Sequence, residues 1–353
     1  MWPTDRLQKL LGIEHPVLQA PMAGASTPAM AIAVANAGGM GALGCAMMSA
    51  EQLRAAAVEV AAGTTRAVNF NFFVHEEPDL AKHAAEPMHE ALKPYYADYG
   101  LGEPVAPKAG APSFDDEILE ALLACAPKVA SFHFGLPKAH VVEALKRAGA
   151  KLIGNATNVT EAKALEVGGM NAIVAQGAEA GGHRGAFFGA PHENDMGTMA
   201  LVPLVVDAVR VPVIAAGGIF DGRGVAAAFM LGASGVQIGT AFLRSPESAA
   251  AVLHKQALAG TPDNATKLTR LFSGRPARSI SNRLVRELAA HEADAAPFPT
   301  QRAVIAPLAK AAETQGSADF MQLWSGQAGL RAEAAPSAEI FRRICDEALA
   351  LLR

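Results

Sequence analysis

The feature that most constrains the fold of this chain is a regular alternation of short apolar segments with alanine-rich segments of helical length. Eight apolar segments occur, at residues 16–20, 41–45, 67–72, 129–132, 151–155, 172–175, 211–215 and 235–238. Helical segments follow five of them, at residues 28–37, 50–62, 137–148, 159–167 and 222–231. Strands that alternate with helices form right-handed βαβ units and a parallel sheet. Eight such strands within roughly 230 residues predict an α/β fold of the (β/α)8 TIM-barrel type, for which about 250 residues are typical.

Two segments interrupt the alternation. Residues 75–113 predict an insertion after the third strand, and residues 246–353 predict a mainly helical C-terminal extension with a polar loop over 261–299. On a (β/α)8 barrel, additions at the carboxyl ends of the strands lie over the active face. We therefore expect a barrel domain over residues 1–245 and an extension packed on the barrel as a lid over its mouth.

Composition narrows the class of partner. The chain is 51% hydrophobic and 18% charged, which is typical of a compact globular protein. Lys and Arg number 30 against 34 Asp and Glu, a net charge of −4, and no basic run offers a surface for phosphate backbones. Residues 16–50 carry no charge, but prolines and glycines interrupt them, so they predict a buried strand, helix and strand rather than a membrane span. Nucleic acid and membranes are not expected partners, and we expect a monomer or homodimer.

The cysteines indicate a cellular compartment. Cys45, Cys125 and Cys345 lie far apart and form no CxxC pair, so neither a disulfide framework nor a local zinc site is expected. The first residues carry Asp5, Arg6 and Lys9 and show no apolar core of a secretory signal. These features predict a protein of the reducing cytoplasm.

Glycines follow the last two predicted strands, a pair after the seventh and a single one after the eighth. They stand in Ala215-Ala216-Gly217-Gly218-Ile219 and in Gln237-Ile238-Gly239-Thr240. Glycines let backbone N–H groups approach an anion, and the loops after strands seven and eight of a barrel are the usual phosphate site. One glycine pair alone could merely turn a strand into a helix, but glycines after both of these strands favour a phosphate cradle.

Two histidines lie where predicted strands end. His183 stands in the glycine-rich loop 176–185 after the sixth strand, and His133 ends the fourth strand. An isolated histidine is more often a hydrogen-bonded structural residue, but two at strand ends of one barrel predict a functional pair. Each could serve as a base, a hydrogen-bond donor or an anchor for an anion. A zinc site fails on ligand count, so no metal is expected.

Amides and an apolar segment suggest a ring-binding surface. Asn71 lies near the end of the third strand and Gln176 at the end of the sixth, and either amide could hydrogen-bond a neighbouring loop or a heteroaromatic ring with both donor and acceptor groups. Pro21 and Met22, after the first strand, could supply a flat apolar wall. Met47 and Met48 continue an apolar segment and are assigned to the core.

These residues resemble the FMN-dependent nitronate monooxygenases of class I, formerly called 2-nitropropane dioxygenases. The resemblance spans nearly the whole chain and is carried by residues 19–24, 69–73, 131–135, 176–185, 215–221 and 237–241, with Trp324-Ser325-Gly326-Gln327 near the end. It implies that FMN lies at the barrel mouth. The candidate cofactor-binding residues are Ala20, Pro21, Met22 and Asn71 near the ring, Gln176, Gly181 and Gly182 beside it, and Gly217, Gly218, Gln237, Ile238, Gly239 and Thr240 toward the phosphate.

The resemblance also implies a reaction. In the family a histidine matching His183 acts as base toward neutral nitroalkanes or helps to bind the anionic nitronate, and His133 matches a second pocket histidine. Nitronates such as propionate 3-nitronate are oxidised by one-electron transfer to FMN, and oxygen then gives a carbonyl compound and nitrite. One departure concerns residues 298–306, where some members place tyrosines and a lysine over the pocket and this chain reads Phe-Pro-Thr-Gln-Arg-Ala-Val-Ile-Ala. The preferred nitronate is therefore left open.

Two alternatives remain at this point. An FMN-dependent NAD(P)H reductase, of enoyl-ACP or quinone reductase type, would use the same barrel and cofactor site. A phosphate-binding barrel without flavin, such as a sugar-phosphate isomerase, would use only the cradle. FMN is expected rather than FAD, because no GxGxxG motif on a first strand could hold a second nucleotide.

Overall fold

The computed structural model describes residues 1–353 except 80–84, 107–112 and 190–194. Its central element is an eight-stranded parallel sheet in the order β1-β9-β8-β6-β5-β4-β3-β2, and a bridge between Leu18 and Met40 joins the two ends into a barrel. The strands are β1 (Val17–Gln19), β2 (Gly41–Gly44), β3 (Val68–Phe73), β4 (Val129–His133), β5 (Lys151–Ala156), β6 (Ala172–Gln176), β8 (Val213–Ala216) and β9 (Gly235–Ile238). The eight predicted apolar segments are these eight strands. The predicted (β/α)8 barrel is confirmed.

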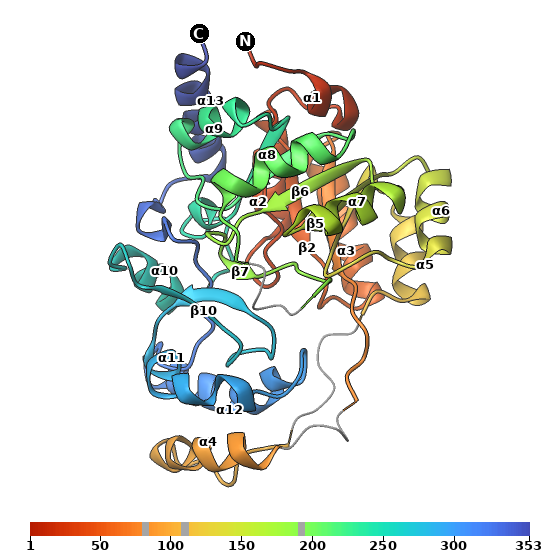
Figure 1. The fold of residues 1–353 in the computed structure, drawn as a ribbon. Helices are drawn as coiled ribbons and strands as arrows, with labels where there is room; N and C mark the ends of the chain where they lie inside the picture. The colour runs from red at the N-terminus through yellow and green to blue at the C-terminus, as the bar shows by residue number, and fades with distance from the viewer. Residues whose placement is uncertain (80–84, 107–112, 190–194) are drawn as a thin grey trace.

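Helices surround the sheet (Figure 1). They are α2 (Pro28–Asn36), α3 (Ala50–Gly63), α5 (Asp116–Ala124), α6 (Ala139–Arg147), α7 (Val159–Val167), α8 (Thr198–Ala208) and α9 (Gly222–Met230). Local sequence fixes where several begin: Ser49 and Gln52 form a reciprocal capping box on α3, and the side chains of Asn158 and Asp221 cap α7 and α9. Helices α5 and α8 were not predicted, because each follows a segment that reads as insertion or loop.

The last helix belongs to the barrel wall. Helix α13 (Ser337–Leu351) packs against α9 and α2, so it occupies the place of the eighth helix in the ring. The Gly222 N–H at the start of α9 donates to Glu347 at 3.0 Å. A Cβ on Gly39 would lie 2.2 Å from the ring of Phe341, so α13 and the start of β2 require this glycine. The extension therefore covers the mouth only with its earlier part.

That earlier part joins the insertion in a small separate core. Helix α4 (Glu86–Asp98) of the insertion packs against α11 (Arg283–Glu287), η4 (Ala289–Asp294) and α12 (Gln301–Thr314) of the extension. The Tyr96 hydroxyl donates to the Val304 carbonyl at 2.6 Å across this core. Figure 1 shows α4 and α12 together at one end of the barrel, with α1 (Arg6–Leu11) at the opposite end. The two predicted lid segments thus form one lid.

A second, three-stranded antiparallel sheet links the lid to the barrel. It contains β10 (Thr266–Thr269), β11 (Ala277–Ile280) and β7 (Gly182–His183), in the order β10-β11-β7. The polar loop predicted over residues 261–299 is therefore wrong, because the segment contains two strands and two short helices. Polar residues interrupt the apolar pattern of both strands, the exposed Lys267 in β10 and the buried Arg278 and Ser279 in β11. Strand β11 pairs directly with β7, with Ala277 opposite His183 and Arg278 opposite Gly182. The extension thereby fixes the loop that carries His183.

The remaining short elements are η3 (Thr240–Phe242), α10 (Val252–Ala259) and η5 (Gly329–Arg331). Within the described ranges, no helix is both long and apolar enough to cross a membrane.

Candidate functional site

A cavity of about 510 Å³ lies at the carboxyl ends of the barrel strands, beneath the lid. Its volume is in the range of small-molecule and cofactor sites. The structure brings almost all predicted site residues to its lining: Ala20, Pro21, Met22, Asn71, His133, Gln176, Gly181, Gly182, His183, Gly217, Gly218, Gln237, Gly239 and Thr240. Ile238 differs, because its side chain is buried in the core between sheet and helices and its carbonyl accepts from the Ala20 N–H at 2.8 Å. Only the backbone of Ile238 remains a candidate for ligand contact.

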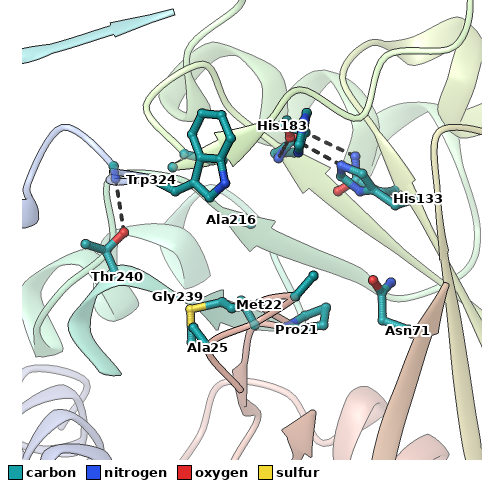
Figure 2. Close-up of a pocket in the computed structure, with 18 of the residues that line it drawn as sticks. Pro21, Met22, Ala25, Asn71, His133, His183, Ala216, Gly239, Thr240 and Trp324 are labelled. Carbon is teal, nitrogen blue, oxygen red and sulfur yellow. Dashed lines mark hydrogen bonds between the residues drawn. The ribbon is translucent and has the colours of Figure 1, made fainter. Parts of the chain in front are cut away.

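The two histidines meet through the backbone of one of them. His133 Nε2 lies 3.2 Å from the carbonyl oxygen of His183. Since a carbonyl only accepts, this hydrogen bond requires the His133 proton on Nε2. His183 Nε2 lies 2.8 Å from the hydroxyl of Ser273, which comes from the loop between β10 and β11. Figure 2 shows both side chains on one side of the cavity.

Both imidazoles are neutral at pH 7. Burial, together with the nearby His133, Arg275 and Arg302, lowers the pKa of His183 to about 3. Burial also lowers the pKa of His133 to about 3, with Arg275 and Arg184 acting in the same direction against the hydrogen bond to His183. A lone pair on each ring is therefore available to accept a proton or hydrogen bond, and an anion placed beside them would raise both pKa values.

Aromatic rings enclose His183. The centroids of Trp324, Phe298, Phe134 and Phe73 lie 5.2, 5.5, 5.7 and 6.2 Å from the centroid of its imidazole. Phe298 and Trp324 come from the extension, and Phe73 and Phe134 from the barrel. Such a shell limits water around the imidazole and strengthens electrostatic interactions within it.

The cavity lining carries one formal charge. Among the described residues that line it, Arg302 of α12 is charged and none is Asp or Glu. Arg302 is exposed at the rim, where its guanidinium contacts Met47. Met47 was assigned to the core, but its side chain is 46% exposed. A cavity with one arginine and no carboxylate in its described lining is suited to an anion.

The glycine-rich loop is held by charged side chains, one buried and one half-buried. Arg184, 1% exposed, donates to the carbonyls of Gln176 and Gly177 at 2.8 and 2.7 Å. Glu179 accepts from the N–H and hydroxyl of Thr198, each at 2.9 Å. These residues were not singled out from sequence, although charged residues inside a glycine-rich loop were the available signal.

Glu161 has a similar role on the other side of the loop. Its fully buried carboxylate accepts from the N–H groups of Phe187 and Phe188 at 2.7 and 3.0 Å, and from the N–H and hydroxyl of Thr157. From sequence, Glu161 is indistinguishable from an ordinary acidic residue in the first turn of a helix. Only the tertiary structure shows that it secures the segment after His183.

The amide of Gln176 is used within the loop. Its Nε2 donates to the His183 carbonyl at 2.9 Å, and its Oε1 accepts from the Gly185 N–H at 2.8 Å. Of the two readings left open for Gln176, the hydrogen bonds to a neighbouring loop are therefore present. Gln176 holds His183 in place from the end of β6.

The loops after β8 and β9 have the geometry of an anion cradle. Gly217 and Gly218 have φ of +116° and +70°, a conformation that other residues rarely adopt. Gly218 lines the cavity, and a Cβ on it would reach van der Waals contact with the side chain of Glu179, at 3.4 Å. The Thr240 hydroxyl accepts from the Gly326 N–H at 3.0 Å, which leaves its own proton to be donated (Figure 2). The 324–327 segment thus closes over this end of the cavity.

No group of three or more His, Cys, Asp or Glu side chains suited to a metal ion occurs in the part of the chain that the structure describes.

This fold and this site define a (β/α)8-barrel enzyme with a lid over its active face. The chain matches the family "Nitronate monooxygenase" over residues 4–347. It is 41% identical over 348 residues to a "Probable nitronate monooxygenase" of Staphylococcus aureus strain JH9, covering 98% of each chain. The chain therefore belongs to the nitronate monooxygenase family of oxidoreductases, and the resemblance seen in the sequence is confirmed.

Solved structures of similar proteins agree with this family assignment. A nitroalkane oxidase from Streptomyces ansochromogenes superposes with a TM-score of 0.90 at 37% identity, covering 98% of both chains. FabK from Thermotoga maritima superposes with a TM-score of 0.77 at 29% identity, covering 98% of this chain and 96% of that one. The second likeness is more distant than the first.

Proposed function

We propose that the protein is an FMN-dependent nitronate monooxygenase that converts alkyl nitronates and O2 to carbonyl compounds and nitrite. The observation that carries this proposal is that two neutral histidines and one arginine line the same cavity as the anion cradle. No carboxylate among the described lining residues opposes them. A nitronate is an anion, so the arginine attracts it and the imidazoles can hydrogen-bond it or take up a proton beside it.

The residues present fit FMN. Gly217, Gly218, Gly239 and Thr240 would hold the phosphate with backbone N–H groups and one hydroxyl, as glycine loops at this end of a barrel commonly do. Met22 would lie against the ring. When bound, FMN supplies one-electron acceptance from the nitronate and passes electrons to oxygen.

His183 has two duties toward substrate in this proposal. With its pKa at about 3 it is a weak base in the cavity without an anion, but an approaching negative charge raises that pKa. For a neutral nitroalkane, His183 would accept the proton on the carbon next to the nitro group. For a nitronate already ionised, it would hold the anion. His133 fixes the backbone of His183 and so orients the loop that carries it.

Arg302 bears on the choice of nitronate. It stands in the 298–306 segment, where the tyrosines and lysine of some family members are missing. Its exposed guanidinium at the rim would favour a substrate with a second negative group distant from the nitronate, such as propionate 3-nitronate. We infer that nitronates with a second negative group on the chain are preferred over nitronates with neutral alkyl chains.

We place the enzyme in the cytoplasm, as a monomer or homodimer without nucleic-acid or membrane partners. The three cysteines are unpaired thiols, and Cys45 and Cys345 are buried. Burial raises the pKa of Cys45 to about 12, so this thiol is unreactive. Such thiols are typical of proteins of a reducing compartment.

A set of measurements on the purified protein tests the proposal. The purified protein should show a flavin spectrum, release FMN and not FAD by mass spectrometry, and change its spectrum on anaerobic addition of propionate 3-nitronate. With air, oxygen should be consumed and nitrite released. Bleaching by NADH or NADPH with no response to nitronate would support the reductase alternative instead. A colourless protein that does not bind added FMN would support the barrel without flavin.

A further inference from the structure

Three polar side chains form a buried cluster on β3 and β4, and two of them, Asn71 and Ser131, belong to the cavity lining. Asn69, Asn71 and Ser131 are 1, 7 and 6% exposed. The Ser131 hydroxyl oxygen lies 2.8 Å from Nδ2 of Asn69 and 2.8 Å from Nδ2 of Asn71. Asn71 and Ser131 stand opposite each other in the register of the two strands. Of the three, Asn71 is a cofactor-binding residue predicted from the sequence, whereas no function was predicted for Ser131.

The cluster settles which way the Asn71 amide points. Asn71 Nδ2 also lies 3.3 Å from the main-chain carbonyl oxygen of Ser131. A carbonyl accepts and never donates, so the atom facing it must be the amide nitrogen. Both Nδ2 hydrogens then have partners on Ser131, one on the hydroxyl and one on the carbonyl.

Asn71 therefore offers the cavity an acceptor alone. Figure 2 shows its oxygen on the side of the other labelled residues and its nitrogen turned away. The bidentate contact considered from sequence, with donor and acceptor both used on a ring, is not available in this arrangement. A ligand that meets Asn71 must supply an N–H or O–H group.

We propose that Ser131 is a positioning residue that fixes Asn71 as a hydrogen-bond acceptor for the ring N–H of the flavin. This inference rests on the proposed FMN function. The oxidised flavin ring carries a single N–H, flanked by two carbonyls. An amide turned the other way would present hydrogens to that N–H, so the orientation imposed by Ser131 decides whether the contact attracts or repels.

The first test is the affinity of the apoprotein for FMN, measured by quenching of FMN fluorescence. Ser131→Ala should raise the Kd about 3- to 10-fold, the size of one lost neutral hydrogen bond. Because Ser131 acts through Asn71, the same change in an Asn71→Ala background should alter the Kd less than about 2-fold. Ser337→Ala is the matched control. Ser337 lies at the start of α13, outside the cavity, and its fully buried hydroxyl hydrogen-bonds the Ser245 hydroxyl at 3.0 Å. Removal of this hydroxyl should leave the Kd for FMN unchanged.

A second test uses the ligand. Wild type should bind FMN methylated at the ring N–H more weakly than FMN, and Ser131→Ala should narrow this difference. Equal binding of the two flavins by wild type would overturn the assignment of the ring N–H as partner.

A third test needs no flavin. In apoprotein labelled with 15N-asparagine, the Asn71 amide protons should exchange slowly in wild type and faster in Ser131→Ala. Unchanged exchange, or full additivity of the two substitutions in the Kd, would overturn the positioning role. A wild-type protein that binds no FMN while the exchange difference is present would instead count against the proposed cofactor, and the orientation of Asn71 would stand.

Discussion

The two halves of the cavity are built in different ways. The glycine half, formed by Gly217, Gly218, Gly239 and Thr240, consists mainly of backbone at the ends of two adjacent strands, β8 and β9. The histidine half, formed by His133, His183, Phe298 and Trp324, consists of side chains from four distant segments, two of them in the extension. A local motif is enough to form the first half, whereas the second exists only when the lid is folded onto the barrel. The comparison predicts that single substitutions act differently in the two halves.

The largest effect is expected in the glycine half. Gly218→Val places a branched side chain at φ +70° in the cavity lining, beside Glu179. The variant should be folded but colourless, with FMN affinity reduced at least about 100-fold, since a Cβ there stands between backbone N–H groups and an anion. Flavin content after purification and circular dichroism measure the two properties.

Gly316→Val is the control for backbone strain. Gly316 has nearly the same φ, +77°, with open space around its Cβ position, and it lies just beyond α12. It should lose about 1–2 kcal/mol of stability and keep its flavin. Retention of flavin by Gly218→Val as well would place the phosphate elsewhere and remove the basis of the comparison.

The next effect belongs to the histidine half. His183→Asn keeps a hydrogen-bonding side chain but removes the titrating nitrogen. If His183 is the base for neutral nitroalkanes, kcat/KM for these should fall about 10²- to 10⁴-fold, while nitronates ionised beforehand suffer less. FMN affinity should be nearly unchanged, because the glycine half is intact. Steady-state kinetics with both substrate forms measure the difference.

His133→Asn serves as the companion variant. His133 reaches the site through the His183 carbonyl, so its loss should cost about 10-fold at most, roughly one hydrogen bond, with both substrate forms affected alike. Equal losses of both substrate forms in His183→Asn would mean that His183 holds the anion. Unchanged kinetics in His183→Asn would move the catalytic role to His133.

The same division explains what could be predicted from the sequence. The eight barrel strands were predictable, because each is a short, mainly apolar run that is buried over nearly its whole length. The glycine half followed from two motifs at strand ends. Strands β10 and β11 were missed, because β10 exposes Lys267 and the segment has neither a long apolar run nor a hairpin glycine pair. The pairing of β11 with β7, which fixes His183, depends on contacts about 95 residues apart in sequence.

The direction in which individual side chains point could not be predicted from the sequence either. Met47 follows an apolar segment, yet it lies at the cavity rim against Arg302, a residue from the far end of the chain. Ile238 lies between the two cavity-lining residues Gln237 and Gly239, but the alternation of β9 turns it into the core. In both cases the local sequence identifies the segment correctly, and the packing of the lid or the pleat of the strand decides where the side chain goes.

A smaller effect concerns stability against pH. His133 and His183 have pKa values of about 3 in the folded chain, against about 6.5 for an unfolded histidine. Between these pH values the unfolded chain binds protons more readily, so stability is fully present above pH 6.5 and is lost as the pH falls toward 3. At pH 5 each histidine should account for at most about 2 kcal/mol.

Urea unfolding of the cofactor-free protein at pH 7.5 and pH 5 tests this dependence. His183→Asn should lose less stability than wild type between the two pH values, whereas Gly316→Val should lose as much as wild type. An identical loss in wild type and His183→Asn would show that the imidazole is not held neutral by burial.

The smallest effect is expected at the rim of the histidine half. Arg302 is the charged residue in the described lining, and it is exposed, so its attraction for an anion is weakened by water and salt. Arg302→Gln should raise KM for propionate 3-nitronate about 10-fold at low ionic strength, with kcat nearly unchanged, because attraction at the rim acts on bound substrate and transition state alike. The increase in KM should be smaller for a nitronate with a neutral alkyl chain, which offers one negative group instead of two.

The KM of Arg302→Lys should lie between those of wild type and Arg302→Gln, since lysine keeps the charge but not the planar, bidentate guanidinium. Salt at about 0.5 M should reduce the difference between wild type and Arg302→Gln, as the screening length there is shorter than the roughly 10 Å at 0.1 M. If Arg302→Gln changed KM for both nitronates equally and without salt dependence, its role would be to shape the rim. The positive character of the histidine half would then rest on Arg184 and on Arg275, which lies 4.1 Å over the ring of Phe134.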